Sequence, residues 1–167
     1  MAMIAISAMG FLLSDGEKRR VRWIRAMRRC LLRMHDAIRY EQPGLSDLLL
    51  RIDLRATQQE KELTRLLHRC AKRLCPCESP QLLLFFAEES ARLPGYGVLS
   101  EEDRAAFEGV LAELGKNRLN EQLRLIDSAD ERLRAREELL QREGGRRARL
   151  IRTLGVSLGA AVFLILV

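Results

Sequence analysis

The sequence lacks the residues and loop patterns on which most enzymes depend. It has only two histidines, His35 and His68, and histidine is the side chain most often used for proton transfer. Neither a GxxxxGK[ST] loop nor a GxGxxG loop occurs, so the familiar ways of cradling a nucleotide phosphate are missing. No Ser-His-Asp arrangement stands out either. These absences predict a protein that is not an enzyme and that needs no cofactor.

Residues that favour β-structure and irregular loops are also scarce. Aromatic residues make up 5% of the 167 residues, and there are four prolines. Leu, Ala, Glu, Arg and Gln are abundant instead, and these residues favour helices. No internal repeat and no low-complexity linker divides the chain. The composition predicts an all-α fold, one bundle of about six helices with a core of its own.

The four cysteines, Cys30, Cys70, Cys75 and Cys77, do not form the disulfide framework of a small secreted domain. Cys70, Cys75 and Cys77 are the candidates for a metal site, with His68 just before them. Zinc sites usually pair cysteines about two to four residues apart and add a second pair further along, and Cys75 and Cys77 lie closer than that. The favoured interpretation is reduced thiols without a metal, with Cys30 and Cys70 in the core.

Positive and negative charges are segregated along the chain, whose formal net charge is +6. Residues 17–39 hold nine basic and two acidic side chains, and residues 114–152 hold eleven basic and seven acidic ones. Residues 88–113 hold seven acidic and two basic side chains. Both basic blocks adjoin an apolar end of the chain. Such blocks occur in nucleic-acid binders, and also in membrane proteins whose arginines keep the adjoining segments cytoplasmic.

The first apolar end covers residues 1–13. Ser14-Asp15-Gly16 is expected to break the helix there, and the basic residues Lys18, Arg19 and Arg20 follow. A secretory signal carries its positive charges before the apolar run, so this order predicts an anchor with its N-terminus outside. As a helix the run spans about 20 Å, less than the roughly 30 Å hydrocarbon core of a bilayer. A buried or disordered N-terminus is the alternative.

The second apolar end, residues 153–167, has no charged residue and spans about 22 Å as a helix. A basic cluster precedes it and predicts a cytoplasmic body with an exported C-terminus: Arg146, Arg147, Arg149 and Arg152. Gly155 and Gly159 have the spacing that lets membrane helices pack closely, and Gly144-Gly145 is a candidate hinge. The predicted division is a membrane segment at 1–13, a cytoplasmic bundle at 14–152 and a membrane segment at 153–167.

Hydrophobic periodicity and capping patterns predict the helices of the bundle. The expected ranges are 17–41, 45–55, 58–74, 80–93, 101–114 and a last helix from about residue 118. The expected caps are Thr57 with Glu60, Ser79 before Pro80, Ser100 with Asp103, and Gly115 at a helix end. The first helix carries one apolar stripe, formed by Val21, Ile24, Met27, Leu31, Met34 and Ile38. In the last helix Leu119, Ile126, Leu133 and Leu140 repeat every seven residues.

The remaining faces of the helix at 17–41 are basic, and Arg22, Arg25 and Arg29 are the candidates for binding a partner. Its only aromatic residues are Trp23 and Tyr40, which gives little support for stacking on nucleic-acid bases. Anionic lipid headgroups or an acidic protein are therefore the favoured partners. A basic membrane-associated module that binds nucleic acid or an acidic protein is the alternative function.

Three patterns in a fixed order carry a family resemblance. The first helix ends in Ile38-Arg39-Tyr40-x-x-Pro43-x-Leu45, and Gln122 comes seven residues after the glycine of Leu114-Gly115. Leu154-Gly155-x-x-x-Gly159 leads into an apolar end containing Ile165-Leu166. Together they resemble the stage III sporulation protein AB family over nearly the whole chain. The sequence departs from that family at Arg118, where Asp is usual, in its short N-terminal segment and in the Cys75–Cys77 pair.

The resemblance implies a role that composition could not indicate. It implies a component of the membrane apparatus that links mother cell and forespore in endospore-forming bacteria, placed in the mother-cell membrane around the forespore. The body is expected to resemble the helical cytoplasmic domain of the inner-membrane platform protein of type II secretion and type IV pilus machines. The implied partners are a secretion-type ATPase and other membrane components of the channel. A homo-oligomer stays open, and no nucleic acid is expected.

Overall fold

The computed structural model describes residues 2–74, 81–93, 95–116 and 118–166, and for residues 2–15 and 146–166 it describes the backbone only. The described part contains six α-helices, one short 3-10 helix and no β-strand. The elements are α1 (Ala2–Tyr40), α2 (Leu45–Arg51), α3 (Gln58–Leu74), α4 (Leu82–Ser90), η1 (Tyr96–Val98), α5 (Glu101–Glu113) and α6 (Leu119–Leu166). The predicted all-α fold of about six helices is confirmed.

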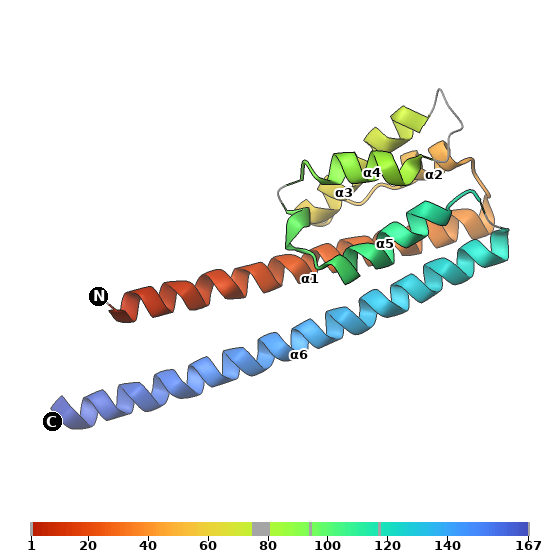
Figure 1. Ribbon diagram of the computed structural model, residues 1–167. Helices are drawn as coiled ribbons and strands as arrows, with labels where there is room; N and C mark the ends of the chain where they lie inside the picture. Colours follow the sequence, from red (N-terminus) through yellow and green to blue (C-terminus); the bar gives the residue numbers. More distant parts are fainter. Residues whose placement is uncertain (1, 75–80, 94, 117, 167) are drawn as a thin grey trace.

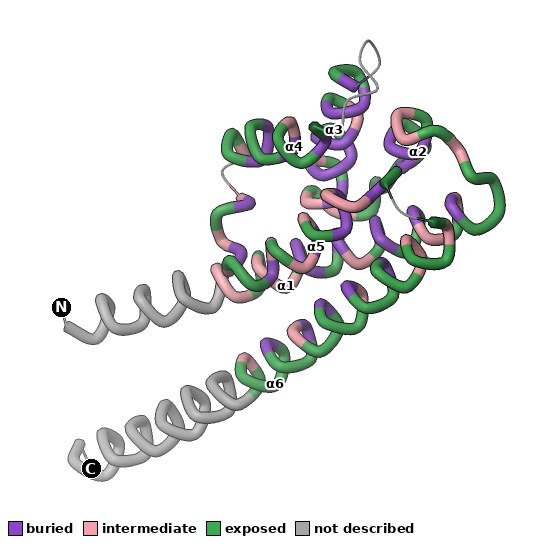
Figure 2. The backbone as a smooth tube through the Cα atoms, turned by 45° about the vertical axis from the view of Figure 1, so that its right-hand side comes forward, coloured by how far each residue is buried: buried purple, intermediate pink, exposed green. Residues whose placement is uncertain are grey.

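Two long helices, α1 and α6, set the length of the molecule. They lie side by side and run in opposite directions, so that α1 begins and α6 ends on the same side (Figure 1). With 39 and 48 residues they are about 58 Å and 72 Å long. The shorter helices pack at the end of this pair that lies away from the chain termini, where most of the buried positions gather (Figure 2).

The apolar stripe predicted for the first helix forms the centre of the core. Ile24, Met27, Leu31 and Met34 are fully buried, and Ile38 is nearly so. On α6 the residues that repeat every seven positions, Ile126, Leu133 and Leu140, are buried as predicted, and Leu119 packs against them from its half-buried position. The periodicity of 3.6 residues per turn places each set on one face of its helix, which confirms both stripes.

Aromatic side chains close the core between α1, α4, η1 and α5. Trp23 and Phe86 both meet Tyr96 edge-on, with ring centroids 5.7 and 5.8 Å apart. Phe107 lies 5.7 Å from Phe86. A Cβ atom at Gly95 would stand 2.9 Å from Nε1 of Trp23. A glycine is therefore needed there, because the chain passes directly over the indole ring.

Three of the four predicted caps are confirmed. The amide of Glu60 donates to Oγ1 of Thr57 over 3.3 Å and the amide of Thr57 to Oε2 of Glu60 over 3.2 Å, which is a capping box. The Asp103 amide donates to the Ser100 hydroxyl over 3.3 Å at the start of α5. Gly115 has φ +80°, which glycine adopts without strain. The predicted cap at Ser79 and Pro80 lies outside the described residues.

The second helix ends at Arg51 and not at Arg55 as predicted. Ile52 and Leu54 are both buried although they are two residues apart, which is the spacing of an extended segment. The Thr64 hydroxyl holds this segment, because it accepts from the Leu54 amide over 3.1 Å and donates to the Leu54 carbonyl over 3.2 Å. The fourth helix is likewise shorter than predicted and covers Leu82–Ser90.

Two predicted interruptions are wrong. The helix α1 continues through Ser14-Asp15-Gly16, and α6 continues through Gly144 and Gly145. A glycine inside a helix costs only about 1 kcal/mol, which neighbouring contacts can offset. At Gly144 the two long helices lie close together, since a Cβ there would be 3.9 Å from Oε2 of Glu17. The hinge predicted at Gly144-Gly145 is therefore continuous helix.

The membrane segments predicted at residues 1–13 and 153–167 are not supported as spans. Among the described residues, no helix combines the length and the apolar character needed to cross a bilayer. The backbone is helical from Ala2 and as far as Leu166, and the side chains there lie outside the described set. The two segments, and the packing role of Gly155 and Gly159, stay predictions.

Candidate functional site

The face that joins α1 to α6 contains a ladder of ion pairs formed by Arg25, Arg28, Asp130 and Glu137. Arg28 donates two hydrogen bonds to Asp130, over 2.8 and 3.2 Å, and a third to Oε2 of Glu137 over 3.0 Å. Nε of Arg25 donates to Oε1 of Glu137 over 2.6 Å. These forked contacts are the stronger kind of ion pair, because geometry and charge act together. We call this set the α1–α6 ladder.

The electrostatics of the ladder favour its charged form. Hydrogen bonding to Asp130 raises the pKa of the Arg28 guanidinium above its ordinary value, although burial opposes this. Burial also acts to raise the pKa of the Glu137 carboxyl, but hydrogen bonds from Arg25 and Arg28 outweigh it, and the pKa lies below its ordinary value. Glu137 therefore stays ionised in the folded protein.

Glu137 gives the protein a predictable acid sensitivity. Because its pKa is lower in the folded state, its stabilising effect is present above the ordinary glutamate value of about 4.3 and is lost as the pH falls through the folded value. We expect the free energy of unfolding to fall as the pH drops below the ordinary glutamate value, and to fall less in Glu137→Gln. Urea unfolding at several pH values measures this. Equal slopes in the wild type and the variant would contradict it.

A second ion cluster ties the start of α5 to both long helices. Asp103 is 3% exposed, and Arg20 donates to it over 2.7 Å from Nε. Arg20 also donates to the Ser100 hydroxyl over 2.7 Å, and Nε of Arg136 lies 3.3 Å from the Asp103 carboxylate. Arg20, a predicted topology residue, is therefore also part of the body's internal packing.

Of the other predicted topology residues, the structure describes the side chains of two. Lys18 and Arg19 are exposed near the point where α1 leaves the body. The side chains of the remaining four, Arg146, Arg147, Arg149 and Arg152, lie outside the described set. Their predicted effect on membrane orientation therefore stays a prediction.

The three predicted partner-binding arginines differ in what they contact. Arg25 belongs to the α1–α6 ladder, and Arg29 forms an ion pair with the buried carboxylate of Glu60. Both remain about half exposed, at 48% and 52% of the side chain. Arg22 is exposed and has no ion pair within the described part of the chain. Arg22 is therefore the one of the three whose charge is fully available to a partner.

The cysteines do not come together as a metal site in the described residues. Cys30 and Cys70 are buried as predicted, and burial raises the pKa of the Cys70 thiol to about 11. Cys75 and Cys77 lie outside the described set, and no cluster of three metal-ligating side chains occurs within it. Nε2 of His68 lies 2.9 Å from the Ile52 carbonyl, so the imidazole already has a hydrogen-bond partner within the fold.

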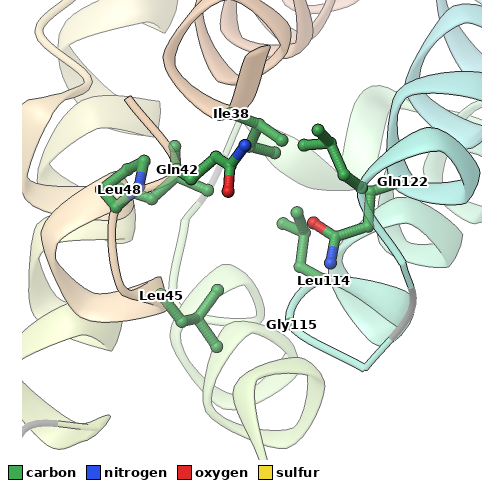
Figure 3. A pocket seen from close by; sticks show the side chains of 9 residues that line it. Ile38, Gln42, Leu45, Leu48, Leu114, Gly115 and Gln122 are labelled. Carbon is green, nitrogen blue, oxygen red and sulfur yellow. The ribbon is translucent and has the colours of Figure 1, made fainter. Parts of the chain in front are cut away.

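A hollow of about 230 Å³ opens at the end of the α1–α6 pair that lies away from the termini. We call it the distal hollow (Figure 3). Gln42 and Gln122 approach it from opposite sides, and Leu114 lies between them. The residues that line it come from the α1–α2 turn and from the α5–α6 turn: Ile38, Gln42, Pro43, Leu45, Leu48, Leu114, Gly115, Leu119 and Gln122.

Two left-handed residues shape the turns around the distal hollow. Gly115 has φ +80°, and Gln42 has φ +45°, a conformation that residues other than glycine rarely adopt. A glycine at position 42 would remove this strain but would also remove the amide side chain. Gln42 stands two residues after the end of α1, where a left-handed residue commonly closes a helix.

Residues from two of the three patterns quoted from the sequence line the distal hollow. Ile38, Pro43 and Leu45 from the first pattern line it, together with Leu114, Gly115 and Gln122 from the second. Sequence reasoning missed the hollow, because its two halves are more than sixty residues apart in the chain. The available signal was that both patterns stand beside a predicted helix end.

Comparison with protein families gives one match that covers the chain. The model of the stage III sporulation protein AB family matches residues 1–167. Comparison with curated proteins and with solved structures gives no match. A match over the full length of the chain shows the family. The chain belongs to the stage III sporulation protein AB family and has a role in sporulation.

Proposed function

We propose that this chain is a membrane-anchored platform of the mother cell–forespore channel, and that it docks a cytoplasmic secretion-type ATPase. Its role would be structural and not enzymatic. Membership of the sporulation family supports the biological setting. Both histidines have partners within the fold, which supports a structural role. His68 contacts a backbone carbonyl, and His35 lies 3.6 Å from both Asp36 and Asp127.

The arrangement of the two long helices carries the proposal. The helix α1 begins and α6 ends on the same side of the molecule (Figure 1). Anchors at both ends with the same orientation, as the basic residues beside them predict, need this arrangement. The shorter helices and the distal hollow then lie on the side that faces away from the membrane, where a cytoplasmic partner can reach them.

The α1–α6 ladder supports a mechanical role. A platform that receives force from an ATPase must keep its two anchored helices in a fixed register. The forked contacts of Arg28 to Asp130 and Glu137 span two turns of α6, so they resist sliding of one helix along the other. Buried apolar contacts at Ile126 and Leu133 add to this register.

The alternative function, a basic module that binds nucleic acid, is favoured by one observation. Arg22 and Arg33 are both exposed on α1, and neither has an ion pair within the described part of the chain. Phosphate contacts would suit these side chains. The two functions predict different partners in a purification of the full-length protein: an ATPase for the first and nucleic acid for the second.

Co-purification from sporulating cells tests the proposed function. The full-length tagged protein, extracted from membranes at low salt, should retain the secretion-type ATPase, identified by mass spectrometry, before and after nuclease treatment. The Arg22→Glu variant should retain the ATPase as well, with Lys61→Glu as an exposed control on α3. Recovery of nucleic acid without the ATPase would instead support the alternative function.

A further inference from the structure

We infer that copies of this chain join head to tail, with the basic face of α1 on one copy against the acidic face of α5 on the next. This contact goes beyond the function proposed above, because it joins the chain to itself and needs no ATPase. Four features of the structure support it: the charge of each face, their placement on opposite sides of the body, their equal height along α1 and their matching spacing.

The exposed face of α1 carries a basic side chain on every turn, and we call it the α1 ridge. It consists of Lys18, Arg22, Arg25, Arg29 and Arg33, all exposed. The carboxylates that pair with Arg25 and Arg29 belong to Glu137 and Glu60, whose side chains are only 11% and 2% exposed beneath them. Asp36 is the acidic residue at the end of the ridge. The surface that a partner meets along the ridge is therefore positive.

The outer face of α5 is acidic and carries small residues between its carboxylates, and we call it the α5 face. Its charge comes from Glu101, Glu102 and Glu108, and Ala105 and Gly109 between them are exposed. A Cβ atom added at Gly109 would meet nothing within 4 Å, so the described part of the chain leaves this face uncovered. Small residues at such positions let a second helix approach closely.

Charges of the opposite sign around the two faces already have partners within the body. Beside the α1 ridge, Asp127 lies 3.6 Å from His35, and Glu138 forms ion pairs with Arg134 and Arg142. The basic residue of α5 itself, Arg104, is half-buried. The ridge therefore keeps its positive charge and the α5 face its negative charge toward solvent.

The two faces lie on opposite sides of the body. Arg20 and Arg22 are two residues apart, which is about 200° around a helix. Arg20 donates to Asp103 on the inner side of α5, so Arg22 points away from α5. On α5 the buried Asp103 and the exposed Ala105 are likewise about 200° apart. The ridge and the α5 face of one copy therefore cannot meet, but those of two copies can.

Both faces lie at the same height along the long axis. The helix α5 starts beside Arg20, which donates to Asp103, and it ends beside Ile38, which lines the distal hollow together with Leu114. It therefore runs alongside α1 and in the same direction (Figure 1). The ridge covers positions 18–33 of this stretch. A second copy placed beside the first in the same orientation brings its α5 face level with the ridge.

The spacing of the charges also matches. Lys18 and Arg25 are seven residues apart, and so are Glu101 and Glu108. Seven residues are about two helical turns, or about 10.5 Å. Counted from the contact at the start of α5, Lys18 is level with Glu101, and Arg25 is level with Glu108. Copies side by side therefore place carboxylates opposite basic side chains, and such complementarity selects the right partner face.

A contact between two different faces leaves one face free at each end of the pair. Such heterologous contacts add further copies and give rings or open chains, whereas a two-fold contact stops at the dimer. Copies related by rotation about an axis along α1 also keep their termini on one side. We therefore expect oligomers larger than a dimer that dissociate as salt screens the charges.

Zero-length crosslinking locates the contact. A carbodiimide joins an amine to a carboxylate that touches it, and Lys18 is the lysine of the ridge. Unlabelled and isotope-labelled full-length protein in non-ionic detergent would be mixed after nuclease treatment and crosslinked at low salt. We expect Lys18 of one form joined to Glu101 or Glu102 of the other. Mixed crosslinks only through other faces, such as Lys61 on α3, would overturn the inference, as would a protein that sediments as a monomer or stops at a dimer.

A charge swap tests the pairing. Arg22→Glu and Glu101→Arg each reverse one exposed charge, and each should raise the Kd of self-association about tenfold or more. The double variant should recover part of the association, because the reversed ridge of one copy meets the reversed α5 face of the next. Arg132→Glu, an exposed change on α6, is the matched control and should associate like the wild type. Equal association in all the variants would overturn the inference.

The outcomes separate this inference from the proposed function. A chain that stays monomeric while it still co-purifies with the ATPase overturns the inference and leaves the platform function standing. Oligomers that retain no ATPase support the inference and count against the platform function. Thermal unfolding identifies a variant that fails to fold. Arg22→Glu keeps the test decisive, because Arg22 is exposed and has no ion pair within the described part of the chain.

Discussion

Asp103→Ala is expected to lower the free energy of unfolding by about 3–5 kcal/mol, the range for removing one partner of a buried ion pair. Asp103 is 3% exposed and accepts a hydrogen bond from Arg20. Without it, Arg20 and Arg136 would be left beside one another with no carboxylate between them. Because about 1 kcal/mol shifts the melting temperature of a chain this size by roughly 2–4 °C, the loss should exceed about 6 °C.

The neighbouring residue Glu102 provides the control for this prediction. Its side chain is 84% exposed and lies 3.8 Å from Arg136. An exposed pair of this kind contributes at most about 1 kcal/mol, so Glu102→Ala should change stability little. Far-UV circular dichroism during heating measures both variants. Equal melting temperatures for the two would show that the cluster around Asp103 does not stabilise the start of α5.

Arg28→Glu is expected to separate α1 from α6. The new carboxylate would face Asp130 and Glu137, which now lie 2.8 and 3.0 Å from the Arg28 nitrogens. Replacing attraction with repulsion at a partly buried site should cost about 3 kcal/mol or more. A loss of this size changes the amount of folded protein in cells several-fold. We therefore expect fewer heat-resistant spores and a lower melting temperature.

A charge swap shows whether the lost stability comes from the broken ion pairs of the α1–α6 ladder or from a general effect of the substitution. The double variant Arg28→Glu with Asp130→Arg restores one ion pair and should recover part of the lost stability. Arg124→Glu, an exposed change on α6, should stay close to the wild type. No recovery in the double variant would mean that the ladder does not hold the two helices together.

The sequence predicted the helical core because its signals are local. Ile24, Leu31 and Ile126 could be assigned to the core from their spacing alone, and all three are buried. Thr57 and Ser100 could be assigned as caps because a cap depends on residues only three positions away.

Contacts between distant residues could not be predicted. Arg25 and Arg28 look like a solvated basic face in the sequence, and only the fold brings them to Glu137, more than one hundred residues away. The glycines at 16, 144 and 145 were expected to interrupt helices, but helix propensity alone does not decide this when two helices run side by side. The distal hollow needs both turns at once and so has no local signature.

Vesicle flotation tests both parts of the proposed function together, the anchoring of the body in a membrane and the docking of a secretion-type ATPase. The full-length protein and the purified ATPase would be mixed with phospholipid vesicles and separated on a density gradient. We predict that the chain floats with the vesicles and that the ATPase floats only when the chain is present. A chain that floats while the ATPase stays at the bottom would contradict docking, and a chain that stays at the bottom would contradict anchoring.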